Sequence, residues 1–326
     1  MLYDVSGLRM VMVIHVHREH SHLVVSTLRE TLVFAFGEKN SITHLDPSIA
    51  GFSTHVPTLA VRNILRRQLS TNFGRTVSTY VDSSLVVQIT PEGAQLMEYD
   101  HTLGQFSKTG QGWYPKTAGA DYARREVVAA AMNASQIILG LSGGVLAILN
   151  LAQNDTLQLV TSHTFPNEVC AISCQPLDPA KSYAPSMAVS FWGSNEVLIL
   201  ALDTPNPFHQ IANAPRVTLP SLPRSILLHN FGTSGQTTHP EFRPHLLIGL
   251  ADGTLITYAF RDKGLHDRKQ SSLGNAPVSL SVCQSEERTV VLASGSRANL
   301  LFWDNQRIKP SPVSIKVGLQ LSASLW

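Results

Sequence analysis

The stretch His245-Leu-Leu-Ile-Gly-Leu-Ala-Asp-Gly-Thr-Leu-Ile-Thr-Tyr258 holds two apolar runs that meet at Asp252 and Gly253. Each run has the length and the aliphatic content of a buried strand. An Asp-Gly pair between two such runs is typical of a tight hairpin, and a type I′ turn there requires a positive φ at both central residues. The stretch therefore predicts two antiparallel strands joined by a short turn.

The same unit, an apolar run, a tight turn and a second apolar run, recurs along the chain. Its turn glycines are Gly37, Gly93, Gly143, Gly193, Gly253 and Gly295. Successive glycines are 56, 50, 50, 60 and 42 residues apart, a mean of about 52, which is close to the length of one β-propeller blade. Weaker strands at 58–64, 168–173 and 278–283 bring the number of strands in each unit to about four, the composition of a blade.

We therefore predict an all-β chain that folds as a β-propeller with about six recognisable blades. The segment 10–16 is expected to be a strand of the first blade, and 105–120 and 230–244 are expected to be loops. A propeller closes when its last blade pairs with its first. We interpret 1–326 as a single propeller domain, either a six-bladed ring or a piece of a longer protein that is incomplete at one or both ends.

The composition agrees with a chain that has a large buried core and little helix. Of the 326 residues, 43% are apolar and only 15% are charged, whereas charged residues make up about a quarter of an average globular protein. The formal net charge of +2 is too small to indicate a polyanionic partner by itself. Cys170, Cys174 and Cys283 are an odd number and are predicted to be small buried thiols in a reducing compartment.

The segment 127–154 has no charged residue and could be either a membrane-spanning helix or a pair of buried strands. Its interior contains Asn133, Gln136 and Asn150, whose amides would be costly in hydrocarbon. Two strands around a turn at Ser142-Gly-Gly144 explain the segment better, and no contact with a membrane is expected.

Gly140-Leu-Ser-Gly-Gly144 matches the GxSxG pattern of a nucleophile elbow, which exposes a serine at a strand-to-helix turn. The same spacing of glycines recurs at 249–253 with Ala251 in place of the serine. A pattern that recurs without the serine indicates a turn and not a nucleophile. We predict that the chain is not an enzyme and that it has no catalytic residues and no cofactor.

Four histidines, His15, His17, His20 and His22, are close enough in sequence to gather a metal ion. Only Glu19 is available nearby to complete such a site. Solvated loop histidines are the favoured interpretation, and no metal is predicted.

Arg62, Arg66, Arg67 and Arg75 lie in a segment, 61–81, that has no acidic residue. Phosphate contacts of a nucleic acid are one hypothesis for them, and a solvated loop is the other. There is no Walker loop, GxGxxG motif or zinc-finger spacing to support nucleotide chemistry.

Several motifs resemble one propeller family. They are Pro223-Arg-Ser-Ile-Leu-Leu228, Leu246-Leu-Ile-Gly-Leu-Ala-Asp-Gly253, Gly264-Leu-His-Asp-Arg-Lys269 and Leu273-Gly274, with Ser135-Gln-Ile-Ile138 and Glu168-Val-Cys170 in matching order upstream. Together they resemble the second β-propeller of the large subunit of the UV-damaged-DNA-binding protein. Two sister families share the architecture, the splicing factor 3b propeller subunit and the large subunit of the cleavage and polyadenylation specificity factor, and Pro91-Glu-Gly93 is as similar to the splicing branch.

The resemblance implies a non-enzymatic adaptor of cullin-RING ubiquitin ligases in the nucleus, possessing three propellers of which the second holds the cullin. It also implies a second propeller of seven blades, so that this chain with its six hairpins would be a truncated seven-bladed propeller. It implies that nucleic acid is contacted mainly through a receptor partner. In Val189-Ser-Phe-Trp192, Trp192 is at the position of a cullin-facing Trp in that family, and Gly193, Ser194 and Asn195 share its turn. Packing of Trp192 between blades is the competing interpretation, and the subunit of an RNA-processing complex or a direct nucleic-acid binder are the alternative functions.

Three regions depart from the family pattern. They are the His-rich opening, the Arg-rich stretch at 62–75 and the long loop at 232–243. The other two propellers and the helical domain of the family have no counterpart in this sequence, so no docking of substrate receptors is inferred.

Overall fold

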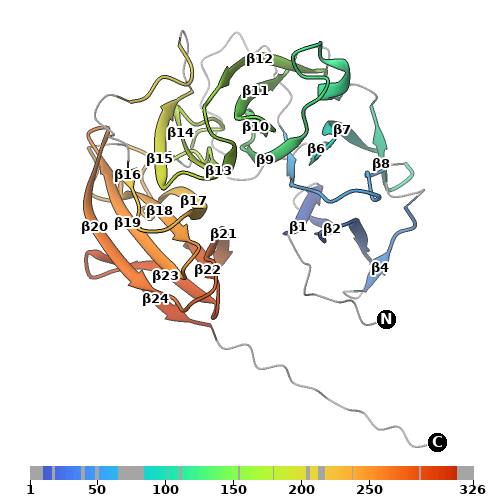
Figure 1. Cartoon of the computed structure of the whole chain (residues 1–326). Helices are drawn as coiled ribbons and strands as arrows, with labels where there is room; N and C mark the ends of the chain where they lie inside the picture. Colours follow the sequence, from blue (N-terminus) through green and yellow to red (C-terminus); the bar gives the residue numbers. More distant parts are fainter. Residues whose placement is uncertain are drawn as a thin grey trace, which may run out of the picture.

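A computed structural model describes residues 10–16, 19–37, 41–47, 51–64, 84–100, 102–109, 112–152, 155–178, 180–202, 206–211, 217–236, 238–285 and 288–313. The strands β1 to β24 form six four-stranded antiparallel sheets, each built from four consecutive strands. The sheets follow one another around an arc, as the blades of a propeller do (Figure 1). The predicted all-β propeller is confirmed.

The strands are grouped here by blade, numbered I to VI along the chain. Blade I holds β1 (Met10–Val16), β2 (Glu19–Ser26), β3 (Thr31–Phe36) and β4 (Ile42–His44). Blade II holds β5 (Ala60–Asn63), β6 (Leu85–Thr90), β7 (Gly93–Asp100) and β8 (Gln105–Lys108). Blade III holds β9 (Val127–Met132), β10 (Ile137–Leu141), β11 (Val145–Leu151) and β12 (Leu157–Thr164), and the 3-10 helix η3 (Pro115–Thr117) precedes it.

The other three blades follow the same order. Blade IV holds β13 (Val169–Ser173), β14 (Ser186–Phe191), β15 (Glu196–Ala201) and β16 (Val217–Thr218). Blade V holds β17 (Pro223–Asn230), β18 (Pro244–Leu250), β19 (Thr254–Arg261) and β20 (Gly264–Ser272). Blade VI holds β21 (Ser279–Ser285), β22 (Arg288–Ser294), β23 (Asn299–Asp304) and β24 (Arg307–Pro312).

The hydrophobic core lies between blades, because the second strand of a blade buries both of its faces. On β18, Leu246 and Ile248 pack into the cluster shared with blade IV, whereas Leu247 packs into the cluster shared with blade VI. Alternate residues of a strand point to opposite faces, so an uninterrupted apolar run serves two neighbours at once. The low charge of the chain follows, since such strands have no solvent-facing side.

Six blades share five clusters, one for each pair of successive blades. Among the described residues no further cluster joins blade VI to blade I, and the ring of sheets is open (Figure 1). Backbones approach closely across these interfaces: a Cβ at Gly249 would lie 2.4 Å from the carbonyl oxygen of Val278. Only glycine fits at that position on β18.

Neighbouring strands run in opposite directions, so the connections within a blade alternate between the two edges of the ring. We call the edge with the connections between second and third strands the turn edge, and it carries residues 192–195 and 251–253. The opposite edge, the loop edge, carries the first-to-second connections, including 174–185 and 231–243, and the third-to-fourth hairpins at 262–263 and 305–306.

The structure corrects two details of the repeat. The Gly37 turn joins the third and fourth strands of blade I, whereas the other five turn glycines join second and third strands. The segment 105–120, expected to be a loop, contains β8 and η3. A Phe or Trp flanked by polar residues gives a weak strand pattern, which explains why β8 was missed.

The Asp252-Gly253 turn also differs from the prediction. Only Gly253 has a positive φ, +86°, and three residues connect β18 to β19, so the turn is not type I′. Two-residue turns with positive φ at both positions occur instead at Asp262-Lys263 (50° and 56°) and Asn305-Gln306 (46° and 63°). These sequences lack the glycine that usually signals a type I′ turn.

The two strands predicted in the uncharged segment 127–154 are β10 and β11, and a further strand, β9, precedes them. Ile137 to Leu141 pair in register with Leu149 to Val145 across the Ser142-Gly-Gly144 turn. Within the described ranges, no helix has the length and apolarity needed to cross a membrane.

Candidate functional site

Trp192 is the first residue of the turn between β14 and β15, at the turn edge of blade IV. Its neighbour Phe191 is buried in the cluster between blades III and IV, whereas Trp192 is 40% exposed. Alternation along the strand explains the difference, because consecutive side chains point to opposite sides. Both interpretations of Trp192, packing between blades and contact with a partner, stay predictions, because its side chain is partly covered and partly exposed.

The indole of Trp192 makes a cation–π contact with an arginine of the next blade. The guanidinium carbon of Arg224, the second residue of β17, lies 4.4 Å from the centroid of the Trp192 ring. A guanidinium at this distance interacts favourably with the π electrons of the indole and limits its rotation. The pair offers an aromatic surface and a positive charge together, at the seam between blades IV and V.

Backbone hydrogen bonds fix the turn on both sides. The N–H of Trp192 donates to the carbonyl of Glu168 at 2.7 Å, and the carbonyl of Asn195 accepts from the N–H of Leu219 at 2.8 Å. Gly193 has a φ of +70° and open space around it, so backbone conformation, not crowding, favours glycine there. The turn is thus held at its ends, while at its tip Gly193 is exposed and Ser194 is half-buried.

Cys170 lies beneath this seam. Its thiol donates to the carbonyl of Pro223 at 3.3 Å. Burial raises the pKa of the Cys170 thiol, although nearby Arg224 and a hydrogen bond with Ser190 act in the opposite direction. A protonated, hydrogen-bonded thiol contributes to the contact between blades IV and V and is a poor nucleophile.

The other predicted thiols differ in their surroundings. Cys174 is fully buried, and burial raises its pKa to about 12. Cys170 is only half-buried, and both are free cysteines. The side chain of Cys283 lies outside the described residues.

The GxSxG frame lies on a strand, a turn and a strand, β10 to β11, and not on the strand-to-helix turn of a nucleophile elbow. The Ser142 hydroxyl accepts a hydrogen bond from the backbone N–H of Glu126 at 3.0 Å. The Ser142 carbonyl accepts from the Arg125 guanidinium at 2.6 Å. These contacts connect the turn to the preceding segment and account for Ser142 structurally.

Arg62 lies on β5 with its side chain half-buried. Its Nη1 donates to the carbonyl of Met132 at 3.2 Å and to Gln175 Oε1 at 3.5 Å. Burial lowers the pKa of Arg62, with a smaller opposing effect from Cys174. The guanidinium thus ties together blades II, III and IV, while Arg66, Arg67 and Arg75 lie outside the described residues.

The histidines of the opening were expected in a solvated loop, and this was wrong for three of them. His15 lies on β1, and His20 and His22 lie on β2, while His17 is outside the described residues. His22 is buried against Phe106, with ring centroids 5.0 Å apart, and burial lowers its pKa to about 4. Among side chains that the structure describes, no three His, Cys, Asp or Glu residues gather as metal ligands.

Sequence reasoning missed Arg224 as the partner of Trp192. The Pro-Arg pair could have indicated where β17 starts, because Pro is tolerated at the first position of a strand. It would have placed Arg224 at the beginning of that strand. It also missed a second Arg–Trp pair at the loop edge, in which Arg243 lies over the ring of Trp303 at 5.3 Å. Contacts between residues so far apart in sequence become visible only in the fold.

Comparison with known proteins matches residues 5–323 to the family described as the RSE1/DDB1/CPSF1 second beta-propeller. The chain is 27% identical over 296 residues to DNA damage-binding protein 1b of Arabidopsis thaliana and 25% identical over 298 residues to DNA damage-binding protein 1 of Oryza sativa subsp. japonica. The relative from Solanum lycopersicum, DNA damage-binding protein 1, is 25% identical over 300 residues. In each case 90% of this chain aligns, but it spans only 23% of the relative's length.

Proposed function

Because the chain belongs to the RSE1/DDB1/CPSF1 second-propeller family, we propose that it is a non-enzymatic scaffold that binds a cullin-type protein. It would act as part of a ubiquitin-ligase adaptor in the nucleus, in the response to DNA damage. The damage-binding names of the curated relatives support this choice. The exposed Trp192, held by Arg224 at the turn edge, is the observation that carries it.

The Trp192 turn has the properties of an anchor for a protein partner. Trp and Arg are enriched among the residues that dominate binding energy, and Trp buries a large area with few rotatable bonds. Gly193, Ser194 and Asn195 would contribute backbone and polar contacts around the indole. Because the turn is already fixed by its backbone hydrogen bonds, little ordering would be needed on binding.

The proposal is tested by measuring the affinity of the whole chain for an immobilised N-terminal region of a cullin. We expect Trp192→Ala to weaken binding by about tenfold or more, the loss typical of a central aromatic anchor. Tyr183→Ala is the matched control, because Tyr183 is a similarly exposed aromatic of blade IV but lies in the connection at the loop edge. Equal binding by the wild type and Trp192→Ala would remove the turn from the interface.

The description of the family also includes proteins of other complexes, so affinity capture from nuclear extract must distinguish them. Recovery of splicing or polyadenylation subunits in place of a cullin would replace the adaptor proposal with the RNA-processing alternative.

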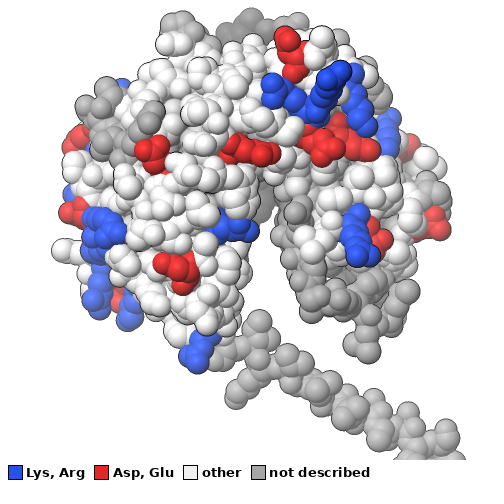
Figure 2. All heavy atoms as spheres, in the orientation of Figure 1, with Lys and Arg blue, Asp and Glu red and all other residues white. Residues whose placement is uncertain are grey.

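Direct nucleic-acid binding through Arg62, Arg66, Arg67 and Arg75 stays a prediction. Polyanion-binding proteins usually carry a continuous basic stripe. Figure 2 shows Lys and Arg in separate clusters on the face drawn, with uncharged surface and patches of Asp and Glu between them. Duplex or single-strand binding at low salt that survives conversion of all four arginines to Ala would exclude this patch.

A further inference from the structure

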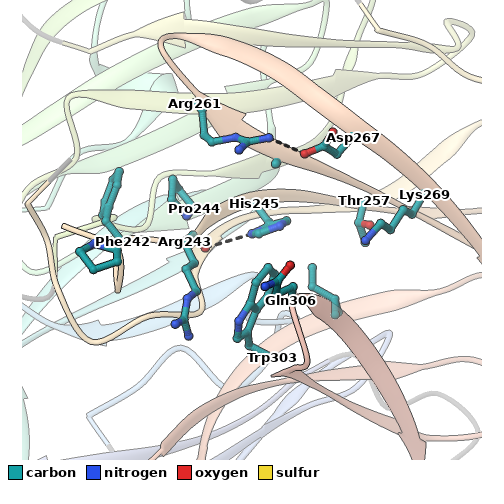
Figure 3. Close-up of a pocket in the computed structure, with 13 residues that line it drawn as sticks. Phe242, Arg243, Pro244, His245, Thr257, Arg261, Asp267, Lys269, Trp303 and Gln306 are labelled. Carbon is teal, nitrogen blue, oxygen red and sulfur yellow. Dashed lines mark hydrogen bonds and ion pairs between the residues drawn. The ribbon is translucent and has the colours of Figure 1, made fainter. Parts of the chain in front are cut away.

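A pocket of about 470 Å³ opens at the loop edge, between blades V and VI (Figure 3). Its walls include Arg243, His245, Arg261, Asp267, Lys269 and Trp303. The volume falls in the range of about 300–1,000 Å³ that is usual for ligand pockets. The Trp192 turn lies at the opposite edge of the ring, so this pocket is separate from the proposed cullin site.

Strand alternation explains how the polar side chains converge. Thr257, Ala259 and Arg261 are alternate residues of β19 and therefore share one face, and Lys269 of β20 is the direct partner of Thr257. A β-bulge interrupts the ladder between Thr257 and Ala259, and Asp267 lies within it with a φ of +51°. The bulge turns the Asp267 carboxylate to the same face, where it forms an ion pair with Arg261.

Trp303 forms the aromatic wall. Its ring lies between Arg243, 5.3 Å from the ring centroid, and the ring of His245, whose centroid is 5.2 Å away at an angle of 52°. Pro244 and Ile308 extend the apolar surface beside it. The Trp303 side of the pocket therefore presents an aromatic surface flanked by Arg243, and Arg261, Asp267 and Lys269 lie apart from it (Figure 3).

The charges of the pocket do not balance. Arg261 pairs with Asp267, and Arg243 pairs with Glu241. Lys269 is exposed, and no carboxylate among the described residues lies within ion-pair distance of its ammonium group. Lys269 is thus the cation of this pocket that is available to an incoming anion.

His245 adds a hydrogen-bonding group without adding charge. Its Nδ1 lies 3.0 Å from the carbonyl of Arg243, which can only accept, so Nδ1 carries the proton and Nε2 is an acceptor. Burial lowers the pKa of His245, and the neighbouring Lys269 and Arg261 act in the same direction. A neutral imidazole can accept a hydrogen bond from a peptide N–H.

We propose that this pocket binds a short acidic peptide segment of a protein partner. A carboxylate of the segment would pair with Lys269, and an adjacent aliphatic or aromatic side chain would pack on Trp303. The segment would thus combine one negative charge with one apolar group, matching the two sides of the pocket. Charge complementarity would select the acidic group of the segment, and the aromatic wall offers a large apolar surface for its neighbour.

A nucleic acid fits these observations less well. Two of the three cations already have carboxylate partners, and a strand of phosphates would meet Asp267 and Glu241 as well as Lys269. A single carboxylate needs only the one available cation.

The test begins with a random seven-residue peptide library displayed on phage and selected on the whole chain. Recovered sequences are synthesised with a fluorescein label, and their affinity is measured by fluorescence anisotropy. We expect them to combine Asp or Glu with an aromatic or aliphatic residue. Both Lys269→Glu and Trp303→Ala should weaken their binding about tenfold.

Matched controls keep the result specific. Arg268→Glu makes the same charge change at the neighbouring position of β20, which does not line the pocket, and should leave affinity within about twofold. Exchanging the peptide's acid for Lys should restore binding to the Lys269→Glu variant, which shows that this variant is folded and that the two charges meet. Trp192→Ala should have no effect, so failure of the cullin proposal and failure of this one are distinguishable.

Two outcomes would overturn the proposal. One is that no selected peptide depends on both Lys269 and Trp303. The other is that a fluorescein-labelled single-stranded oligonucleotide binds with the same dependence on these two residues and the peptides do not.

Discussion

The Trp192–Arg224 pair and the Trp303–Arg243 pair bring the same two side-chain types together at opposite edges of the ring. Blade V supplies both arginines, one at the start of β17 and one immediately before β18. At the turn edge the arginine comes from the blade that follows the Trp, and the indole stands on a hairpin tip, 40% exposed. At the loop edge the arginine comes from the preceding blade, and the half-buried indole lines a pocket.

The difference teaches that the surroundings of an Arg–Trp pair decide its use. A projecting indole on a fixed turn can enter a depression on a partner, whereas an indole in a recess can receive a side chain from a partner. The first arrangement adds less to folding stability because the side chain of Trp192 is 40% exposed. The second also holds two blades together, since Trp303 contacts Arg243 and His245 across the seam.

The largest expected effect is therefore on stability at the loop edge. Trp303→Ala should lower the free energy of unfolding by about 2 kcal/mol, because it removes a half-buried side chain from the seam between blades V and VI. Trp192→Ala should lower it by less, about 1 kcal/mol, because a cation–π contact and a partly exposed surface are lost. Urea denaturation of the two variants measures both quantities. A larger loss of unfolding free energy for Trp192→Ala than for Trp303→Ala would contradict the view that Trp303, and not Trp192, holds two blades together.

Acid should affect the loop edge through His229. This residue of β17 is buried, its Nε2 has no hydrogen-bond partner among the described residues, and its ring packs on Phe231 with centroids 4.8 Å apart. Burial, with a contribution from His245, lowers the pKa of His229 to about 4, so the folded chain keeps it neutral. The unfolded chain takes up a proton near pH 6.5, and stability is lost as pH falls from 6.5 towards 4.

Between pH 7.5 and pH 5, we expect His229 alone to account for a loss of about 2 kcal/mol. His229→Leu should make unfolding less sensitive to acid by that amount, as measured by urea denaturation at both pH values. His239→Leu, which removes an exposed histidine from the connection between β17 and β18, is the control for the substitution itself. The same acid sensitivity in the wild type and in His229→Leu would show that this imidazole is not the responsible group. His22, whose pKa is also lowered to about 4 by burial, should account for much of what is left.

The smallest effect is expected at the turn edge. Gly193→Ala should cost about 1 kcal/mol, because the backbone has a φ of +70° there and L-residues other than Asn and Asp avoid this region. Gly193→Asn should cost less, since no atom lies within 4 Å of an added Cβ and Asn tolerates the left-handed conformation. Thermal unfolding midpoints of the two variants provide the comparison. Equal losses would indicate that steric contacts, and not φ, determine the residue at this tip.

The propeller could be predicted because its signal is repeated. Apolar runs such as those around Gly143 and Gly253 bury both faces of a strand, and this requirement leaves a mark in the sequence at every blade. The weaker first strands at 58–64, 168–173 and 278–283 were also found, within a few residues of β5, β13 and β21. The turn types were not predictable from glycine alone, since Asp262-Lys263 and Asn305-Gln306 adopt positive φ without it.

The site was only partly accessible from the sequence. An exposed Trp192 at a turn follows from strand alternation, but its partner Arg224 is brought to it by the packing of two blades. His22 illustrates the opposite failure, because a histidine in a polar-looking stretch was expected in solvent and lies in an aromatic cluster. The pocket depends on a bulge at Asp267, and no sequence pattern predicts a left-handed Asp within a strand.

Because the five core clusters join the six blades in a row, the stability of this part of the chain depends on each blade and on its contacts with the blades next to it. Within the described part of the chain, each inner blade packs on two neighbours, whereas blades I and VI each pack on one, as in a solenoid, so cooperativity there passes through nearest-neighbour interfaces. Opening is expected to start by fraying at blades I and VI and to move inward. Amide hydrogen exchange should accordingly be slowest in β10 and β14, in the blades with a neighbour on both sides.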